Sequence, residues 1–332
     1  MGHFHQESKG DQLLSYLDLS QRQMVIKKRE EEIPKERRKR QIRNRMVYND
    51  GGLYGFVQML TYKCLRFGKE LPVPPSYRNQ HVFIRFERQE NTIMAEHKMQ
   101  MNGVQITWLG HATFKITTPQ GKIILIDPWT KTNPVCPEEL KQVDKVDLML
   151  VSHGHFDHVA DAVEIAKATK PTVVAIVELA GWLKSKGVEN TVGINKGGTV
   201  DINGIKVTMT HAIHTSGTED GSYGGDAAGF VIEFENGRKL YHAGDTCAFS
   251  DMAIIGELYR PDVALLPIGD FYTMAPKEAA IAVRMLGVKH VIPMHYGTFP
   301  ILTGPPEALR ESLQTLGLHE VEVIAMKPGE TV

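Results

Sequence analysis

This chain is organised around residues 151–158, Val-Ser-His-Gly-His-Phe-Asp-His. The largely apolar residues 146–150 precede the motif and predict a buried strand, whereas apolar residues recur at helical spacing between Val159 and Ala166. The motif is therefore predicted to lie on a turn that leads from a strand into a helix. A strand followed directly by a helix favours a fold of the α/β class.

The residue types in this motif point to metal binding. Residues two apart point the same way in an extended turn, so His153 and His155 can hold one cation together. Asp157 and His158 come where the chain begins to coil, so they face a different direction and can bind a second cation. Imidazole and carboxylate groups are costly to bury without partners, which favours a metal site over core packing. Two cations about 3.5–4 Å apart form a hydrolytic centre.

The His-x-His-x-Asp-His run resembles the signature of the metallo-β-lactamase superfamily, whose members are mostly metal-dependent hydrolases. The resemblance implies a later histidine on the first metal, a bridging aspartate and a last histidine on the second metal. His214, Asp245 and His295 follow apolar runs in that order. The resemblance therefore implies that these three residues complete the set of metal ligands.

Several positions leave a choice of residue or role. His211 competes with His214 as the third ligand of the first metal, and we favour His214 because it lies closer to the glycine-rich segment and matches the family position best. Asp157 is expected to have a catalytic role as well, accepting a hydrogen bond from the hydroxide that two cations produce. Asp127 is a natural carboxylate partner for a metal-bound imidazole. Structural roles are equally well supported for Asp127 and for His111.

A wider resemblance spans residues 104–328, about two-thirds of the chain. The motifs at 108–111, 241–246, 266–270 and 294–300 resemble a metal-dependent hydrolase branch related to the ascorbate-6-phosphate lactonases. This resemblance implies a four-layer αββα sandwich, the metallo-β-lactamase fold, in which two sheets pack face to face with helices outside.

The pattern of strands agrees with that fold and sets the domain boundaries. Residues 104–109 and 122–126 are predicted strands, with a hairpin signal at 119–121 between them. Residues 99–332 are therefore expected to form the hydrolase domain. Residues 1–98 are expected to form a charged N-terminal extension with one amphipathic helix, because they show no second layer to bury a core.

Composition excludes several classes of protein. The chain has 332 residues, 42% of them hydrophobic, and a net charge of −1, which gives no general attraction to nucleic acids or acidic membranes. No apolar run is long enough to span a membrane, so the expected location is the cytoplasm. The three cysteines are scattered, which argues against a disulfide framework or a thiolate zinc site. A homo-oligomer is compatible with these features.

These observations lead to a hypothesis of metal-dependent hydrolysis. Two divalent metal ions would lower the pKa of a bridging water toward 7 and give hydroxide that attacks a small ester, lactone or phosphodiester. Ligands rich in histidine and free of thiolate suit Zn²⁺, with Mn²⁺ and Fe²⁺ as alternatives. The glycine-rich residues 217–229 are a candidate substrate loop.

Two other functions compete with this hypothesis. An RNA- or DNA-processing nuclease of the same superfamily is suggested by the basic residues 37–45, but the near-neutral catalytic region disfavours a nucleic-acid partner. A non-enzymatic metal-binding module is disfavoured because the full set of expected ligands is present. A small molecule is therefore the expected substrate.

Overall fold

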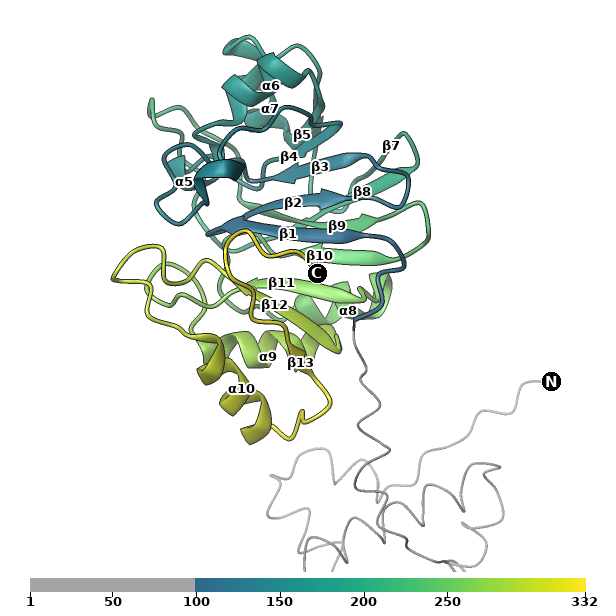
Figure 1. Ribbon diagram of the computed structural model, residues 1–332, viewed down its shortest axis with the longest axis vertical. Helices are drawn as coiled ribbons and strands as arrows, with labels where there is room; N and C mark the ends of the chain where they lie inside the picture. Colours follow the sequence, from purple (N-terminus) through teal and green to yellow (C-terminus); the bar gives the residue numbers. More distant parts are fainter. Residues whose placement is uncertain (1–98) are drawn as a thin grey trace, which may run out of the picture. The chain divides into compact units, whose positions relative to one another are not determined.

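Two β-sheets face each other in residues 99–332, the part of the chain that the computed structural model describes (Figure 1). The predicted N-terminal extension and its amphipathic helix lie outside the described residues. None of the helices between residues 99 and 332 has the length and apolar character that a bilayer crossing requires. Cys136 and Cys247 are free thiols, and Cys64 lies outside the described residues.

The first sheet has six strands in the order of the chain. The β1–β2 and β2–β3 pairs are antiparallel, and the remaining neighbours are parallel. Because β1 and β3 both run opposite to β2, β1 points the same way as β3, β4 and β5. The strands are β1 (Gln105–Gly110), β2 (Thr113–Thr117), β3 (Ile123–Ile126), β4 (Leu148–Leu150), β5 (Thr172–Ile176) and β6 (Thr191–Ile194).

The second sheet has seven strands in the order β13-β12-β11-β10-β9-β8-β7. Its β10 to β13 half is parallel and its β7 to β10 half is antiparallel, so β8, β10, β11 and β12 point the same way. The strands are β7 (Thr199–Ile202), β8 (Ile205–His211), β9 (Ala228–Glu233), β10 (Lys239–His242), β11 (Val263–Pro267), β12 (His290–Met294) and β13 (Glu322–Val323).

Helices cover the outer faces of both sheets (Figure 1). On the first sheet they are α6 (Ala162–Thr169) and α7 (Val177–Ser185), and the short α5 (Phe156–Val159) follows β4. The second sheet is covered by α8 (Met252–Tyr259), α9 (Pro276–Leu286) and α10 (Pro306–Thr315). A 3₁₀ helix, η2 (Glu138–Leu140), lies in the loop between β3 and β4.

Alternation along the strands explains why two apolar cores form. In β9, Phe230 and Ile232 belong to the core shared with the first sheet, whereas Val231 between them belongs to the core under the outer helices. Successive side chains of a strand point to opposite faces, so a strand that is apolar at every position can supply both cores. The predicted four-layer αββα sandwich is confirmed.

The structure corrects one local prediction. The hairpin signal at 119–121 joins β2 to β3 and not β1 to β3, because the additional strand β2 lies between them. The Leu109-Gly110-His111 stretch forms the preceding turn, with Gly110 at φ +100° and a bulge in the β1–β2 register. A Cβ atom on Gly110 would lie 2.7 Å from the Val135 side chain, so the turn needs glycine on both grounds.

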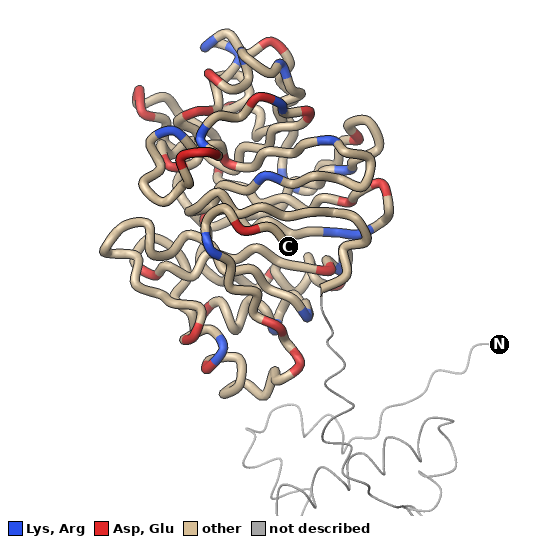
Figure 2. Tube along the Cα trace, in the orientation of Figure 1, with Lys and Arg blue, Asp and Glu red and all other residues tan. Residues whose placement is uncertain are grey.

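Charged residues of both signs are interspersed along the described part of the chain (Figure 2). Many of them pair with each other at the surface, as Lys206 does with Glu233 at 3.0 Å and Arg238 with Asp262 at 2.8 Å. Within residues 99–332 the trace shows no continuous basic stripe of the kind that follows a nucleic-acid backbone (Figure 2).

Candidate metal centre

The strand directions bring distant histidines and aspartates to one edge of the sandwich. His111, Asp127 and His153 follow the ends of β1, β3 and β4, which are parallel to one another. In the other sheet, the ends of β8, β10 and β12 precede His214, Asp245 and His295. Backbone hydrogen bonds from His295 N to His111 O at 3.0 Å and from Ala228 N to Ser152 O at 3.1 Å join the sheets at this edge.

The first group of donor atoms comes from His153, His155 and His214. One nitrogen of each ring lies within 4.8 Å of the others. His153 Nε2 is 3.1 Å from His155 Nδ1. His155 has an extended backbone immediately before α5, so the sequence prediction that these two side chains point the same way agrees with the observed turn.

A second group contains His111, Asp157, His158 and His295, again with donor atoms within 4.8 Å of one another. The Asp157 Oδ2 atom is 2.9 Å from His111 Nε2 and 3.8 Å from the Nε2 atoms of His158 and His295. Asp157 and His158 lie in α5, directly after His155. The ring of His158 is also 4.1 Å from that of His153 between centroids, and these two histidines form a third set of donors with Asp245. The expectation that Asp157 and His158 both face away from the first group therefore does not hold for His158.

Asp245 lies between the two groups. Its Oδ2 atom is 2.9 Å from His295 Nε2 and 3.3 Å from His158 Nε2 on one side. On the other side it is 3.6 Å from His214 Nε2 and 3.9 Å from His153 Nε2. Donor atoms that share a tetrahedral zinc ion lie roughly 3.3 Å apart, given Zn–N bonds of about 2.0–2.1 Å. One carboxylate thus reaches both groups at distances suited to coordination.

Unpartnered polar atoms at the centre of the cluster test whether cations fit. His158 Nε2, His295 Nε2 and Asp245 Oδ1 are buried and make no well-aligned hydrogen bond within the described residues, although both nitrogens lie within 3.3 Å of Asp245 Oδ2. Buried polar atoms almost always have a partner, and an orphaned atom costs about 1–3 kcal/mol. Divalent cations at these atoms would remove that cost, so the donor set fits bound metal.

Outer contacts fix the orientation of the imidazoles. Ser152 Oγ lies 2.9 Å from His153 Nδ1, and Asp127 Oδ2 lies 2.9 Å from His158 Nδ1. Thr215 Oγ1 is 3.2 Å from His155 Nε2. Each contact occupies the ring nitrogen that faces away from the cluster and leaves the other nitrogen available, as second contacts to metal-binding histidines usually do.

Charges in the cluster oppose one another. Burial alone would lower the pKa of His158, but the carboxylates of Asp245, Asp157 and Asp127 raise it well above its usual value. Burial lowers the pKa of His153 well below its usual value. Burial would raise the pKa of Asp245, yet His158 and His295 hold it well below its usual range. Ionised carboxylates are therefore concentrated at a buried site that attracts positive charge.

The candidate ligands His211 and His214 lie in different surroundings. His214 Nε2 belongs to the first group and is 3.6 Å from Asp245. His211, the last residue of β8, instead has its Nδ1 atom 3.0 Å from Lys196 Nζ and its ring against Phe249. The geometry brings His214 into the cluster and leaves His211 outside it.

The sequence left His111 open between a role in the site and a structural role. Its side chain is fully buried within the second group, and its ring lies 3.9 Å from that of His295 between centroids. His111, Asp127 and His295 all have positive φ, at 57°, 48° and 56°. Such backbone strain in residues other than glycine is concentrated at functional sites, but it cannot be read from sequence. The usable signal was the position of His111 directly after a strand.

A pocket of about 650 Å³ opens beside the cluster. His155, Asp157, His214, Asp245 and His295 contribute to its floor. The start of the glycine-rich segment lines it through Gly217, Thr218 and Glu219, where the sequence suggested a substrate loop. A small molecule in this pocket would therefore touch the candidate metal ligands.

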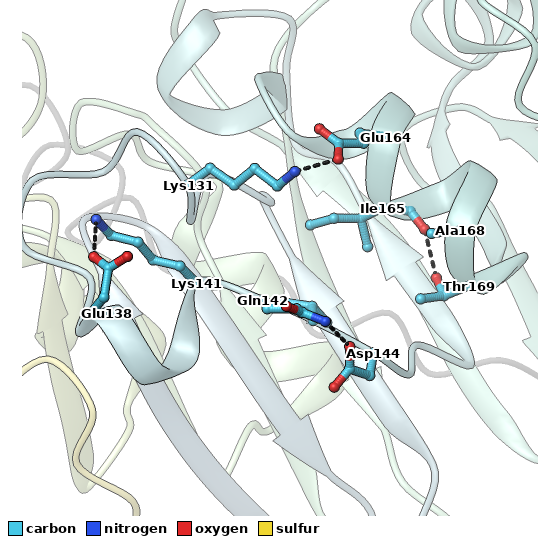
Figure 3. A pocket seen from close by; sticks show the side chains of 10 residues that line it. Lys131, Glu138, Lys141, Gln142, Asp144, Glu164, Ile165, Ala168 and Thr169 are labelled. Atoms are coloured by element: carbon cyan, nitrogen blue, oxygen red, sulfur yellow. Dashed lines mark hydrogen bonds and ion pairs between the residues drawn. The ribbon is translucent and has the colours of Figure 1, made fainter.

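A second hollow of about 730 Å³ lies between η2 and α6, and none of the clustered residues lines it (Figure 3). Its lysines point to acidic partners: Lys131 pairs with Glu164, and Lys141 with Glu138 at 2.8 Å. The fifth charged residue of the lining, Asp144, accepts a hydrogen bond from Gln142 Nε2 at 2.7 Å. The hollow therefore has no cluster of unpaired catalytic groups.

Comparison with known proteins agrees with the geometry. Residues 122–296 match the family model described as the β-lactamase superfamily domain. A UPF0173 metal-dependent hydrolase of Koribacter versatilis is 57% identical over 70% of this chain and 99% of its own length. The relative from Rubrobacter xylanophilus is 58% identical over 69% of this chain and 96% of its own length. The solved structure of Igni18, a metallo hydrolase from Ignicoccus hospitalis, has a TM-score of 0.61 at 38% identity, covering 69% of this chain and 97% of that one.

Proposed function

The chain belongs to the UPF0173 metal-dependent hydrolases of the β-lactamase superfamily, and we propose that it uses two divalent cations to hydrolyse a small ester, lactone or phosphodiester. The observation that carries this proposal is the position of Asp245, whose single oxygen reaches both groups of donors beside a pocket. Residues 99–332, which contain every one of these side chains, form the hydrolase domain in this proposal.

The proposal assigns the residues to two sites. His153, His155 and His214 would hold one cation, and Asp157, His158 and His295 the other, with Asp245 bridging. Nitrogen and carboxylate donors without thiolate suit Zn²⁺ best, with Mn²⁺ and Fe²⁺ as alternatives. When bound, the cations would acidify water and polarise the oxygen of the bond to be cleaved.

Asp157 would act on the nucleophilic water itself. Its side chain is 15% exposed and lines the pocket, whereas Asp245 is only 3% exposed at the side chain. Burial would raise the pKa of Asp157, but His158 and the hydrogen bond from His111 lower it below its usual value. The carboxylate therefore stays ionised at neutral pH and can accept a hydrogen bond from water, fixing its orientation toward the substrate.

The pocket favours a small molecule over a nucleic acid as the substrate. The described residues that line it include no lysine or arginine that would bind a phosphate backbone. The nuclease hypothesis therefore gains no support from the site.

Metal analysis combined with a substrate screen tests this function. The purified protein is expected to contain about two equivalents of divalent metal and to cleave at least one member of a panel of aryl esters, lactones and bis-aryl phosphodiesters. Chelation should abolish turnover, and added Zn²⁺, Mn²⁺ or Fe²⁺ should restore it. Turnover that survives complete removal of metal would contradict the proposal, and a protein that binds metal but cleaves nothing would favour the binding-module hypothesis.

A further inference from the structure

The walls of the pocket differ sharply from its floor. The floor consists of candidate metal ligands, whereas one wall carries Phe156 and Phe299. Both rings pack against the buried Trp129, with centroids 5.7 Å and 5.9 Å from it. Because Trp129 is fixed in the core, this aromatic wall is preformed and needs no ligand to order it.

The lining of the pocket also includes aromatic and aliphatic side chains that are exposed to solvent. Tyr272 and Ile301 line it and are 57% and 40% exposed. Phe271, which is 65% exposed, contacts the Tyr272 ring with centroids 4.7 Å apart. Exposed apolar side chains that line a pocket offer an apolar ligand a surface on which both are removed from water.

Backbone strain accompanies this exposure. Asp270 and Phe271 are consecutive residues other than glycine with positive φ, at 64° and 50°. The segment lies directly against the metal-site edge, since a Cβ atom on Gly269 would come within 2.0 Å of the His295 carbonyl oxygen. The chain therefore holds two aromatic rings outside the core in a costly conformation next to a candidate ligand.

Positive charge is missing from the same surroundings. Among the described residues, those that line the pocket include one charged side chain other than the candidate ligands, and it is acidic, Glu219. The loop between β12 and α10, which carries Ile301, shows neither blue nor red (Figure 2). An anionic substrate would find no counter-charge from the protein beyond the metal centre itself.

We propose that the substrate is an uncharged carboxylic ester or lactone whose apolar group lies against the lining formed by Phe156, Phe299, Tyr272 and Ile301. This inference rests on the proposed function and narrows it. Water adds to the acyl carbon and the carbon–oxygen bond breaks, giving a carboxylate, an alcohol and a proton, so no further reactant is required. The pocket volume of about 650 Å³ lies in the usual range for small-molecule sites.

The first test varies the length of the acyl chain on the metal-loaded protein. We expect kcat/KM to rise about twofold for each methylene from 4-nitrophenyl acetate to the hexanoate, because a group buried on one side gains about half of the transfer free energy of a methylene. Rate enhancement over the uncatalysed reaction should be larger for these esters than for bis(4-nitrophenyl) phosphate. A larger enhancement for the phosphodiester would overturn the inference.

A pair of matched variants separates the pocket from the general surface. Ile301→Ser should remove a large part of the dependence on chain length, and Ile301→Lys should favour the anionic phosphodiester relative to the hexanoate ester. Ile254 on α8 is 53% exposed and lies outside the pocket, so Ile254→Ser and Ile254→Lys are the controls and should change neither property. Equal effects at both positions would rule out a specific apolar subsite.

Binding of product-like acids distinguishes this inference from the proposed function. Calorimetric titration of the metal-loaded protein with acetate, butyrate and hexanoate keeps the carboxylate constant and changes only the apolar part. Affinity that rises with chain length, without turnover of any substrate, would support the apolar subsite while refuting the hydrolase function. Turnover of esters with no dependence of rate or affinity on chain length would leave the hydrolase function intact and refute the subsite.

Discussion

Asp127 offers the sharpest test of how the metal centre is organised. Its carboxylate is fully buried and accepts three hydrogen bonds: Oδ1 from Ser152 N at 2.7 Å, and Oδ2 from Ser152 Oγ at 2.6 Å and from His158 Nδ1 at 2.9 Å. Asp127→Asn preserves the shape but replaces one acceptor oxygen by an NH₂ donor. If that donor takes the place of Oδ2, it meets the N–H of His158.

The imidazole can avoid this conflict only by moving its proton. With Nδ1 deprotonated to accept from the amide, the neutral His158 ring must carry its proton on Nε2, the atom that faces Asp245 and the cluster. A protonated nitrogen cannot bind metal. We therefore expect Asp127→Asn to weaken one cation site about 10- to 100-fold, which corresponds to about 1.4–2.8 kcal/mol, the range of one hydrogen bond to a charged group.

Asp161 provides a matched control for the loss of a buried carboxylate. Its Oδ2 atom accepts from Thr130 N at 2.6 Å and Lys131 N at 2.9 Å, and none of its hydrogen bonds involves a histidine. Asp161→Asn should lower the melting temperature yet leave metal affinity unchanged. The assay is competition between each chelator-stripped protein and a zinc-binding dye, with thermal melts to verify folding. Equal affinities for the wild type and Asp127→Asn, or an equal loss in both variants, would refute the reasoning.

Four further predictions follow from the same geometry. His214→Ala should lower metal stoichiometry and activity together, whereas His211→Ala should keep its metal, and metal analysis showing the opposite pattern would reverse the assignment. Asp157→Asn should keep the fold and the cation of the first group while activity falls by orders of magnitude, so a near wild-type rate would contradict its role. The chain from Met99 onward should fold and hydrolyse without the preceding segment, as melts and assays of the truncated protein will show. Burial and His295 lower the pKa of His111 from 6.5 to about 4, so metal-free protein should lose stability as pH falls through that window. Between pH 6.5 and 4 the unfolded chain binds a proton at His111 that the folded chain does not. In denaturant unfolding, the free energy of unfolding of His111→Gln should therefore change less steeply with pH than that of the wild type, by about 1.4 kcal/mol per pH unit.

Much of the metal cluster could be predicted because its residues lie directly after strands. His295 follows β12 and Asp245 closely follows β10, so locating apolar runs also locates the candidates. Parallel strands place their carboxyl ends at one edge, which turns an order along the chain into proximity in space. The His-x-His-x-Asp-His run added the local turn. The motif itself indicated His153, His155, Asp157 and His158, and the family resemblance selected His214, Asp245 and His295 among the residues after strands. The structure places all seven in one cluster, although the sequence did not show which strands are neighbours.

The role of His111 was harder to predict for a physical reason. Its place beside Asp157 depends on a left-handed backbone at φ 57° and on packing against His295, a residue far away in the sequence. Strand β2 was not predicted from the sequence, for a similar reason. A tight turn at Gly110 sends the chain back against β1, and no proline or paired turn residues mark that position.

The apolar lining of the pocket could not be predicted from hydrophobic periodicity. Tyr272 and Ile301 lie in loops, where neither a period of two nor of 3.6 residues separates buried from exposed apolar side chains. The proposed contact with substrate requires these side chains to be exposed, whereas sequence rules for apolar residues assume that they are buried. The candidate metal ligands lie after strands and the proposed substrate contacts lie in loops, so relatives with the same candidate ligands can differ in substrate. For that reason the acyl-chain series and the Ile301 variants address what the motif leaves undetermined.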